Sequence, residues 1–229
     1  MNAKLVYGYG VNDSDRAYRK SEEHKVFYAS WVRMLERCFP EVRKNRGDAY
    51  KEVSCCNEWL VFSKFANDLS KIENHEKLFD GWHLDKDILV HGNKIYSKET
   101  VCIVPKEINN LLVAKHFKNA GLPQGVTLKE GAYVAQINMF GKHKHIGRFR
   151  SPKSAFLAYK KAKEEYIKVV ANKWKDFISS AVYEALMGWE IKQAIADYES
   201  IYSNDCEILD YPEDYTSPNC KKYDERVKW

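Results

Sequence analysis

The stretch GVTLKEGAYVAQINMFGKHKHIGRFRSPKSAFLAY, residues 125–159, decides the fold of the C-terminal half of the chain. Polar and apolar residues alternate over 133–139 and 144–150, which predicts two antiparallel strands. Gly141-Lys142 lies between them as the turn. An alanine-rich helix is predicted next, over 152–174, with its small and aromatic residues toward the sheet.

Positive charge is concentrated around this segment. Between Lys115 and Lys175 there are fourteen Lys or Arg against three Glu, whereas the whole chain of 229 residues carries a net charge of only +5. A solvated charged face is the ordinary alternative, but an excess of this size on a small sheet is typical of a nucleic-acid surface.

The predicted hairpin offers cations for contact with double-stranded DNA. A β-ribbon fits the major groove of B-DNA, where arginine pairs with guanine and lysine more often meets phosphate. Alternation along the strand predicts that Arg148 and Arg150 share one face. We expect Lys129, Lys142 and Lys144 to hold phosphates, with His143 and His145 beside them.

The same segment resembles the APETALA/ethylene-response-factor type of DNA-binding domain over about residues 120–172. The resemblance implies three antiparallel strands packed on one helix, with the sheet in the major groove. It implies Gln136, Arg148 and Arg150 as base-facing residues and Lys142 and Lys144 as phosphate contacts. The matching motifs are Gly-Val at 125–126, Tyr-Val-Ala-Gln-Ile at 133–137, Gly-Lys at 141–142, His-Ile-Gly-Arg-Phe at 145–149 and Ser-Ala-Phe-Leu-Ala-Tyr at 154–159.

Upstream, the pattern predicts a compact unit of two strands and a helix. Residues 82–89 alternate like a strand, 91–94 form a turn, and 95–104 lead back as a second extended segment. Pro105 then opens a helix, since proline favours the first helical position. Two helices are predicted before this unit, one from His24 to Pro40 and one after Asn57.

This unit resembles HNH endonucleases, which are common in phages and mobile elements. The residues that carry the resemblance are Leu84-Asp85-Lys86-Asp87-Ile88, Gly92-Asn93-Lys94, Tyr96-Ser97, Thr100 to Pro105 and Asn109. With the upstream motifs around Trp31 and Trp59, the resemblance to such phage proteins covers about residues 25–172. It implies a ββα-metal cutting module followed by a DNA-targeting module.

Hydrolysis of a phosphodiester needs an activated water and charge neutralisation at the phosphate. Asp85 and Asp87 are two apart on the predicted strand, so both could face one Mg²⁺ or Mn²⁺ ion. Asn93 or Asn109 could orient the base or a loop. Lys86 or Lys94 could steady the scissile phosphate. The alternative interpretation is that the two carboxylates pair with lysines at the surface of the strand.

The histidine that serves as the general base in HNH enzymes is absent from its usual position in this chain. HNH enzymes carry Asp-His or His-His where this chain has Asp85-Lys86-Asp87. His83 has the same strand parity as the two aspartates and is the favoured substitute, although a histidine beside a tryptophan is often structural. His91 and Tyr96 are the other candidates.

The chain as a whole is predicted to be an α+β protein. The expected order is an irregular leader (1–23), an HNH-like nuclease domain (24–118), a DNA-binding domain (119–175), and a C-terminal helix with an acidic tail (176–229). Hydrophobic and aromatic contents of 45% and 14% suffice for a core and argue against disorder. With no signal peptide or membrane span evident, we expect the cytoplasm of a phage-infected bacterial cell. There the six cysteines are expected to be thiols, and a structural zinc site is not expected.

The tail is acidic, with nine acids against four bases over 197–229. It is either a surface segment, a cover for the basic sheet, or a contact for a host protein. The leading prediction is therefore a metal-dependent HNH-like DNA endonuclease. The alternatives are a non-catalytic DNA-binding protein with a degenerate nuclease fold, and a phage factor that binds a host protein. The pattern gives neither the target sequence nor the oligomeric state.

Overall fold

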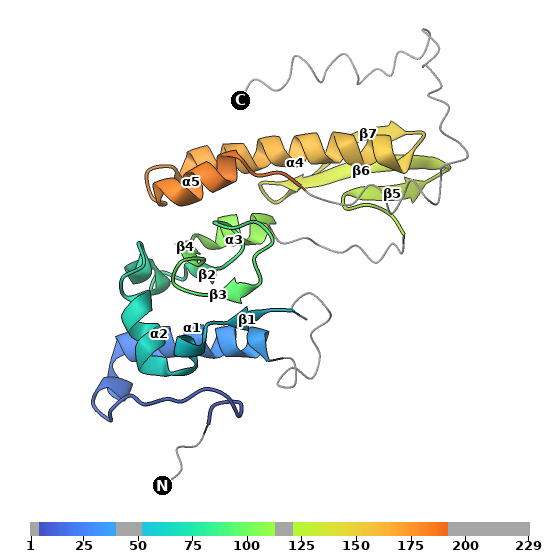
Figure 1. Cartoon of the computed structure of the whole chain (residues 1–229). Helices are drawn as coiled ribbons and strands as arrows, with labels where there is room; N and C mark the ends of the chain where they lie inside the picture. Colours follow the sequence, from blue (N-terminus) through green and yellow to red (C-terminus); the bar gives the residue numbers. More distant parts are fainter. Residues whose placement is uncertain (1–4, 40–51, 113–120, 192–229) are drawn as a thin grey trace. The chain divides into compact units, whose positions relative to one another are not determined.

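The computed structural model describes residues 5–39, 52–112 and 121–191, and Figure 1 shows the order of the elements. By its contacts the chain divides into two units, Met1–Ile191 and Lys192–Trp229, and every described residue belongs to the first. The acidic tail lies outside the described residues, as does the end of the C-terminal helix, which the amphipathic pattern predicts over about residues 177–195. The described part is α+β, as predicted. Its strands and α-helices are α1 (Glu22–Cys38), β1 (Ser54–Cys55), α2 (Phe62–Leu69), β2 (His83–Asp85), β3 (Ile95–Tyr96), β4 (Cys102–Val104), α3 (Lys106–Leu112), β5 (Val126–Lys129), β6 (Ala132–Met139), β7 (Lys142–Phe149), α4 (Pro152–Trp174) and α5 (Ser180–Met187).

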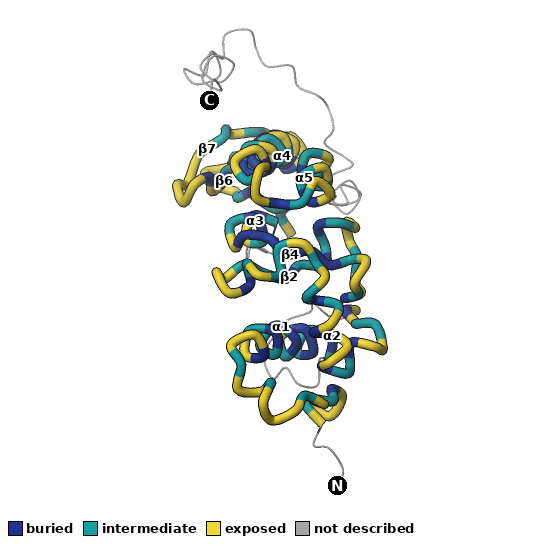
Figure 2. The backbone as a smooth tube through the Cα atoms, turned by 90° about the vertical axis from the view of Figure 1, so that its left-hand side faces the viewer, coloured by how far each residue is buried: buried dark blue, intermediate teal, exposed yellow. Residues whose placement is uncertain are grey.

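Helix α1 forms where the apolar spacing predicts it. Ser21 caps its N-terminus by accepting a 3.1 Å hydrogen bond from the backbone N–H of His24, and Glu22 and Glu23 in the first turn complement the helix dipole. Its inward residues recur every three or four positions, and Figure 2 shows buried positions along α1. They are His24, Phe27, Trp31, Met34, Leu35 and Cys38.

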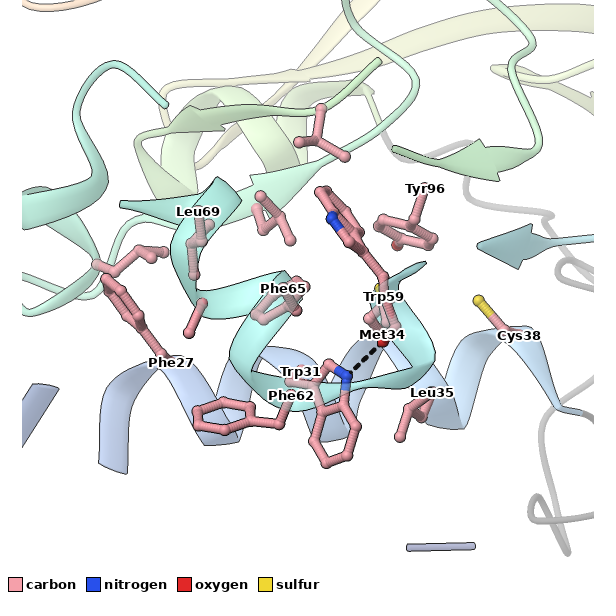
Figure 3. Close-up of a cluster of buried hydrophobic side chains, with 14 of the residues drawn as sticks. Phe27, Trp31, Met34, Leu35, Cys38, Trp59, Phe62, Phe65, Leu69 and Tyr96 are labelled. Atoms are coloured by element: carbon pink, nitrogen blue, oxygen red, sulfur yellow. Dashed lines mark hydrogen bonds between the residues drawn. The ribbon is translucent and has the colours of Figure 1, made fainter. Parts of the chain in front are cut away.

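Two tryptophans lie at the centre of the N-terminal core (Figure 3). Trp31 donates its indole N–H to the backbone oxygen of Trp59 at 2.6 Å, and Trp59 donates its own to Asp68 at 3.0 Å. Both rings are fully buried, so these bonds satisfy donors that would otherwise be costly to bury. Leu84 and Ile103 belong to the same cluster, which fixes β2 and β4 against the helices.

Strands β2 and β4 pair antiparallel, with His83 opposite Val104 and Asp85 opposite Cys102, and α3 follows. This is the predicted order of strand, strand and helix. The strands are shorter than predicted, however. The first ends at Asp85 because its carboxylate accepts backbone N–H bonds from Asp87 and Ile88 and turns the chain. The second is interrupted between Tyr96 and Cys102, where the Thr100 hydroxyl bonds to backbone groups of the turn.

Strands β5, β6 and β7 form the antiparallel sheet expected of the C-terminal half. Both hairpin turns have two central residues with positive φ: Glu130-Gly131 (49° and 73°) and Phe140-Gly141 (51° and 74°). Positive φ at both positions matches the right-handed twist of the flanking strands. The second turn therefore lies one residue before the predicted Gly141-Lys142.

Helix α4 spans the predicted residues and packs on this sheet. Ser151 accepts a 3.1 Å bond from Ser154 N, and Pro152 occupies the first helical position. The buried residues of α4 cover Ala135, Ile137 and Met139 of β6, which are themselves buried. They are Pro152, Ala155, Phe156, Tyr159, Ala162, Tyr166, Ile167, Val170 and Ala171. Helix α5 ends at Met187 because Gly188 closes it, so it is shorter than predicted.

Candidate functional site

The face of the β5–β6–β7 sheet opposite α4 is the first candidate site. Its residues follow from the strand register, because directly paired residues share a face. Gln136 pairs with His145, Asn138 with His143, and Val134 with Arg148 and Thr127. We call this set, with Lys129 at the end of β5, the outer row: Thr127, Lys129, Val134, Gln136, Asn138, His143, His145 and Arg148.

A β-bulge decides which residues of β7 join the outer row. Ala135 pairs with Gly147 and Gln136 with His145, so Ile146 is an extra residue without a partner of its own. Such an insertion reverses the alternation on either side of it. The two histidines of β7 therefore share a face with Arg148, although their parity in the sequence differs.

The bulge corrects the predicted outer face of the hairpin. Lys142 and Lys144 pair with Met139 and Ile137, which are buried toward α4, so they belong to the opposite face from Arg148. Both lysines are nevertheless exposed, because β7 is an edge strand of the sheet. Arg150 is exposed just beyond the end of β7. The residue that sequence reasoning missed is Asn138. His143 and His145 were expected beside the lysines, and the β-bulge places them instead on the face of Arg148.

The outer row is rich in groups that hydrogen-bond to bases or phosphates. Asn138, His143, His145, Arg148 and Lys129 are exposed, and Gln136 is half-buried. Amides offer a donor and an acceptor together, and guanidinium offers a planar fork of donors. Val134 is the exception, buried between its partners on the two neighbouring strands.

Arg148 has an internal partner in the structure. Its two terminal nitrogens lie 3.2 Å from one carboxylate oxygen of Glu130, and one of them donates to the backbone oxygen of Lys129 at 3.3 Å. The Glu130 side chain is 84% exposed, so water screens this ion pair and it contributes little to stability. Another anion or hydrogen-bond acceptor can therefore compete for the guanidinium at low cost.

The second candidate site is the β2–β4–α3 unit. His83 on β2 and Asn109 on α3 are within hydrogen-bond distance, with Nδ1 and Nδ2 3.1 Å apart. Burial lowers the pKa of the His83 imidazole, and the positive charges of Lys106, Arg33 and Arg37 lower it further. The neutral imidazole is thus favoured at neutral pH, as a general base requires.

The two aspartates have other partners. Oδ1 of Asp85 accepts hydrogen bonds from the backbone N–H of Asp87 at 2.7 Å and of Ile88 at 3.1 Å. Burial raises the pKa of the Asp85 carboxyl group. The Asp87 carboxylate pairs with the Lys86 ammonium. Because the strand ends at Asp85, the expectation that both carboxylates share a strand face is wrong. The pairing of a carboxylate with a lysine, the alternative interpretation, is present at Asp87.

The loop between β2 and β3 is held together by Lys86, Asn93 and Tyr96. The Lys86 side chain is 5% exposed and donates to Asp87 and to the backbone oxygen of Asn93. The Asn93 amide donates to the backbone oxygens of Lys86 and Ile95. Tyr96 is 2% exposed, and burial raises its pKa. In this arrangement Lys86 and Tyr96 are not open to a substrate, whereas His91 and Lys94 are exposed.

The carboxylates expected to hold a magnesium ion both have partners within the protein. Asp85 accepts from backbone N–H groups, and Asp87 pairs with the Lys86 ammonium. Within residues 5–39, 52–112 and 121–191, no group of three His, Cys, Asp or Glu is placed to hold a metal ion. The described cysteines, Cys38, Cys55, Cys56 and Cys102, form no disulfide bond, and burial raises the pKa of the Cys102 thiol well above its ordinary value. The expected Mg²⁺ or Mn²⁺ therefore stays a prediction.

Comparison with known protein families, with curated proteins and with solved structures finds no match for the chain. No helix in the described part of the chain is both long and apolar enough to cross a bilayer. What the chain does must therefore be inferred from the geometry of the two candidate sites.

Proposed function

We propose that the protein binds double-stranded DNA through the outer row of the β5–β6–β7 sheet. The observation that carries the proposal is the pairing register. One face of the sheet is covered by α4, and the opposite face presents amide, imidazole and guanidinium groups from adjacent strands. A ribbon with this chemistry matches the width and the hydrogen-bonding pattern of the major groove.

The bulge divides the proposed contacts into two classes. Gln136 and Asn138 suit adenine, and Arg148 suits guanine, because each offers two hydrogen bonds in one plane. Lys142 and Lys144 lie on the edge strand β7, on the opposite face from Arg148. This position suits them for contact with phosphate rather than with bases. Direct readout and backbone contact therefore fall on different residues.

Two matched double variants test this division by fluorescence anisotropy, on a preferred duplex selected from a random pool and on an unrelated duplex. Gln136→Ala with Arg148→Ala should reduce discrimination between the duplexes, by roughly 1–3 kcal/mol for each lost base contact. Lys142→Ala with Lys144→Ala should weaken binding to both duplexes alike and flatten the salt dependence by about 0.9 per lost phosphate contact. Equal effects of the two variants on discrimination would contradict the proposal.

Hydrolysis of the bound DNA at the β2–β4–α3 unit is the second candidate function, and the His83–Asn109 pair favours it. As placed, the Asn109 amide N–H donates to Nδ1, which leaves the proton of the neutral ring on Nε2. Turning the amide over would let its oxygen accept from Nδ1–H and free Nε2 to take a proton from water. Asn109 thus sets which ring nitrogen acts as the base.

Nicking of supercoiled plasmid with Mg²⁺ or Mn²⁺ tests the second candidate. His83→Ala should abolish nicking while leaving duplex binding intact, and Asn109→Asp should retain part of the activity because a carboxylate still accepts from Nδ1–H. Unchanged nicking by His83→Ala would remove His83 from the reaction. Binding without nicking in either metal would favour a non-catalytic DNA-binding protein with a degenerate nuclease fold.

A further inference from the structure

Two histidines of β7 lie side by side on the open face of the sheet. His143 and His145 are two residues apart, and they pair with Asn138 and Gln136 of β6. Residues two apart on a strand share a face, so both imidazoles project from the face opposite α4. Both residues are exposed. Within the described residues, neither ring is joined to the protein by a hydrogen bond, an ion pair or a ring contact.

The spacing of the two rings suits a single metal ion. Residues two apart on a strand are separated by about 6.6 Å along the chain. A tetrahedral zinc ion, with Zn–N bonds of about 2.0–2.1 Å, holds two nitrogens about 3.4 Å apart. Rotation of each side chain about its two single bonds brings the ring nitrogens of His143 and His145 across this difference. Rings at consecutive positions would instead face opposite sides of the sheet.

We propose that His143 and His145 together bind a late first-row divalent metal ion, of the class of Zn²⁺, Ni²⁺ and Cu²⁺. Neutral imidazole is the commonest metal ligand in proteins, and it suits these three ions. The exposed amide of Asn138 lies opposite His143 and offers an oxygen ligand, and water completes the coordination. Two imidazoles make an open, reversible site, unlike the four-ligand structural zinc sites built from cysteine.

Positive charge nearby opposes a divalent cation, but the structure limits this effect. Lys142 and Lys144 lie on the opposite face of β7 from the two rings. Arg148 lies on the same face and pairs with the carboxylate of Glu130. Exposed charges are also screened over a Debye length of about 8 Å at physiological ionic strength. Repulsion therefore lowers the affinity of the site without removing it.

Nuclear magnetic resonance of the full-length chain at pH 7.5, with its histidine rings labelled with ¹⁵N, tests the site. The two signals are identified by their loss in His143→Gln and in His145→Gln, and Zn²⁺ alone is the probe. Because thiols of the chain also bind Zn²⁺, the readout is these two ring signals rather than the total metal bound. We expect both signals to change along one saturating curve. Mg²⁺ prefers oxygen ligands and should leave them unchanged.

Two variants separate a shared ion from independent binding by each ring. His145→Gln should raise the dissociation constant for Zn²⁺ at His143 at least about tenfold, because the second ligand no longer acts at a high effective concentration. Lys144→His with His145→Lys keeps the composition and the charge but places the two rings on opposite faces. It should lose affinity as much as His145→Gln does.

Either of two results would overturn the site: unchanged Zn²⁺ affinity in the exchanged variant, or separate curves for the two rings of the unmodified chain. All three substituted positions are exposed, so the variants should unfold at the same temperature as the unmodified chain. If the exchanged variant does not fold, His143→Gln gives the reciprocal test, in which His145 should lose affinity for Zn²⁺ by the same factor.

The inference goes beyond the proposed function, since metal binding by the two rings does not require DNA. If both rings bind Zn²⁺ but the chain binds no duplex, the metal site stands and the sheet proposal fails. If duplex binds and neither ring responds to Zn²⁺, the metal site is wrong and the sheet proposal stands.

Discussion

At the scale of single residues, Gly125 shows how closely α4 approaches the sheet. Its φ is +77°, and a Cβ atom added to it would lie 2.0 Å from the Cδ2 atom of Tyr159 on α4. A side chain at this position is therefore opposed by both the backbone conformation and the aromatic ring. The Gly-Val pair at the start of the quoted stretch has a packing role that spacing alone does not reveal.

Gly125→Ala should accordingly lower the free energy of unfolding by about 2–4 kcal/mol, measured by urea denaturation. Gly131→Ala is the matched control, since its φ of +73° is similar but an added Cβ meets nothing within 4 Å. The control should lose only the conformational part, about 1–2 kcal/mol. Equal losses in the two variants would show that Tyr159 moves aside.

His24 should make stability depend on pH. It is 6% exposed, its Nε2 lies 3.0 Å from the Ser14 hydroxyl, and burial lowers its pKa below the ordinary value of 6.5. The unfolded chain then takes up a proton before the folded chain does, so stability is full above pH 6.5 and falls as the pH drops toward the lowered value. His83 acts in the same direction.

Denaturation curves at pH 7.5 and pH 5 check this expectation. The unmodified chain should lose stability at pH 5, and His24→Phe should lose less, because the aromatic surroundings accept the ring and the titrating group is gone. His75→Phe serves as the control, since His75 is partly exposed. An unchanged pH dependence in His24→Phe would assign the effect to other groups.

The contrast between Asp85 and His83 shows where prediction from the sequence ends for single residues. Both were predicted from position in a motif, and both lie on β2. Whether a carboxylate binds an ion or ends a strand depends on neighbouring backbone N–H groups, and here Asp85 accepts two of them. The contact between His83 and Asn109 joins residues 26 apart, so alternation and spacing do not indicate it.

At the scale of elements, α4 was predictable to the residue and β7 was not. The start of α4 is fixed by Ser151 and Pro152, which are local signals. The outward residues of β7 depend on the unpaired Ile146, which sequence alternation does not show. A one-residue insertion reverses the face of every side chain beyond it. Of the cations predicted on one outer face, Lys142 and Lys144 therefore lie on the opposite face from Arg148.

The cap of α4 gives a test at this scale. Ser151→Ala removes the acceptor for Ser154 N and should cost about 1 kcal/mol of stability. Ser151→Asp keeps an acceptor and adds a favourable charge at the helix N-terminus, so it should lose little or nothing. Thermal unfolding followed by circular dichroism compares the two. If both variants lose the same amount, the cap does not limit stability.

At the scale of the whole molecule, the α+β class and the three-stranded sheet packed on one helix are confirmed. Alternation, the turn glycine and helical spacing along residues 133–174 predict β6, β7 and α4, whereas the third strand, β5, was expected only from the resemblance. The nuclease interpretation of 24–118 and the role of the tail stay predictions. They depend on chemistry at single sites, and the tail lies outside the described residues.

Salt dependence is the prediction that belongs to the whole chain. The end of β5 and the β7 edge offer four cations for phosphate contact: Lys129, Lys142, Lys144 and Arg150. If one duplex engages them all, the logarithm of affinity should fall with the logarithm of salt concentration with a slope of about −3.6, at about 0.9 per contact. Lys142→Ala should flatten that slope, and a slope near zero would exclude backbone contact.

The burial of Lys86 has a consequence for chemical labelling. Amine-reactive reagents need a free, accessible amine, and this ammonium is enclosed by Asp87 and the backbone of Asn93. Mass spectrometry after brief acylation of the native chain should therefore recover Lys86 unmodified while exposed lysines such as Lys142 are labelled. The rate at which Lys86 becomes reactive would then report how often its loop opens.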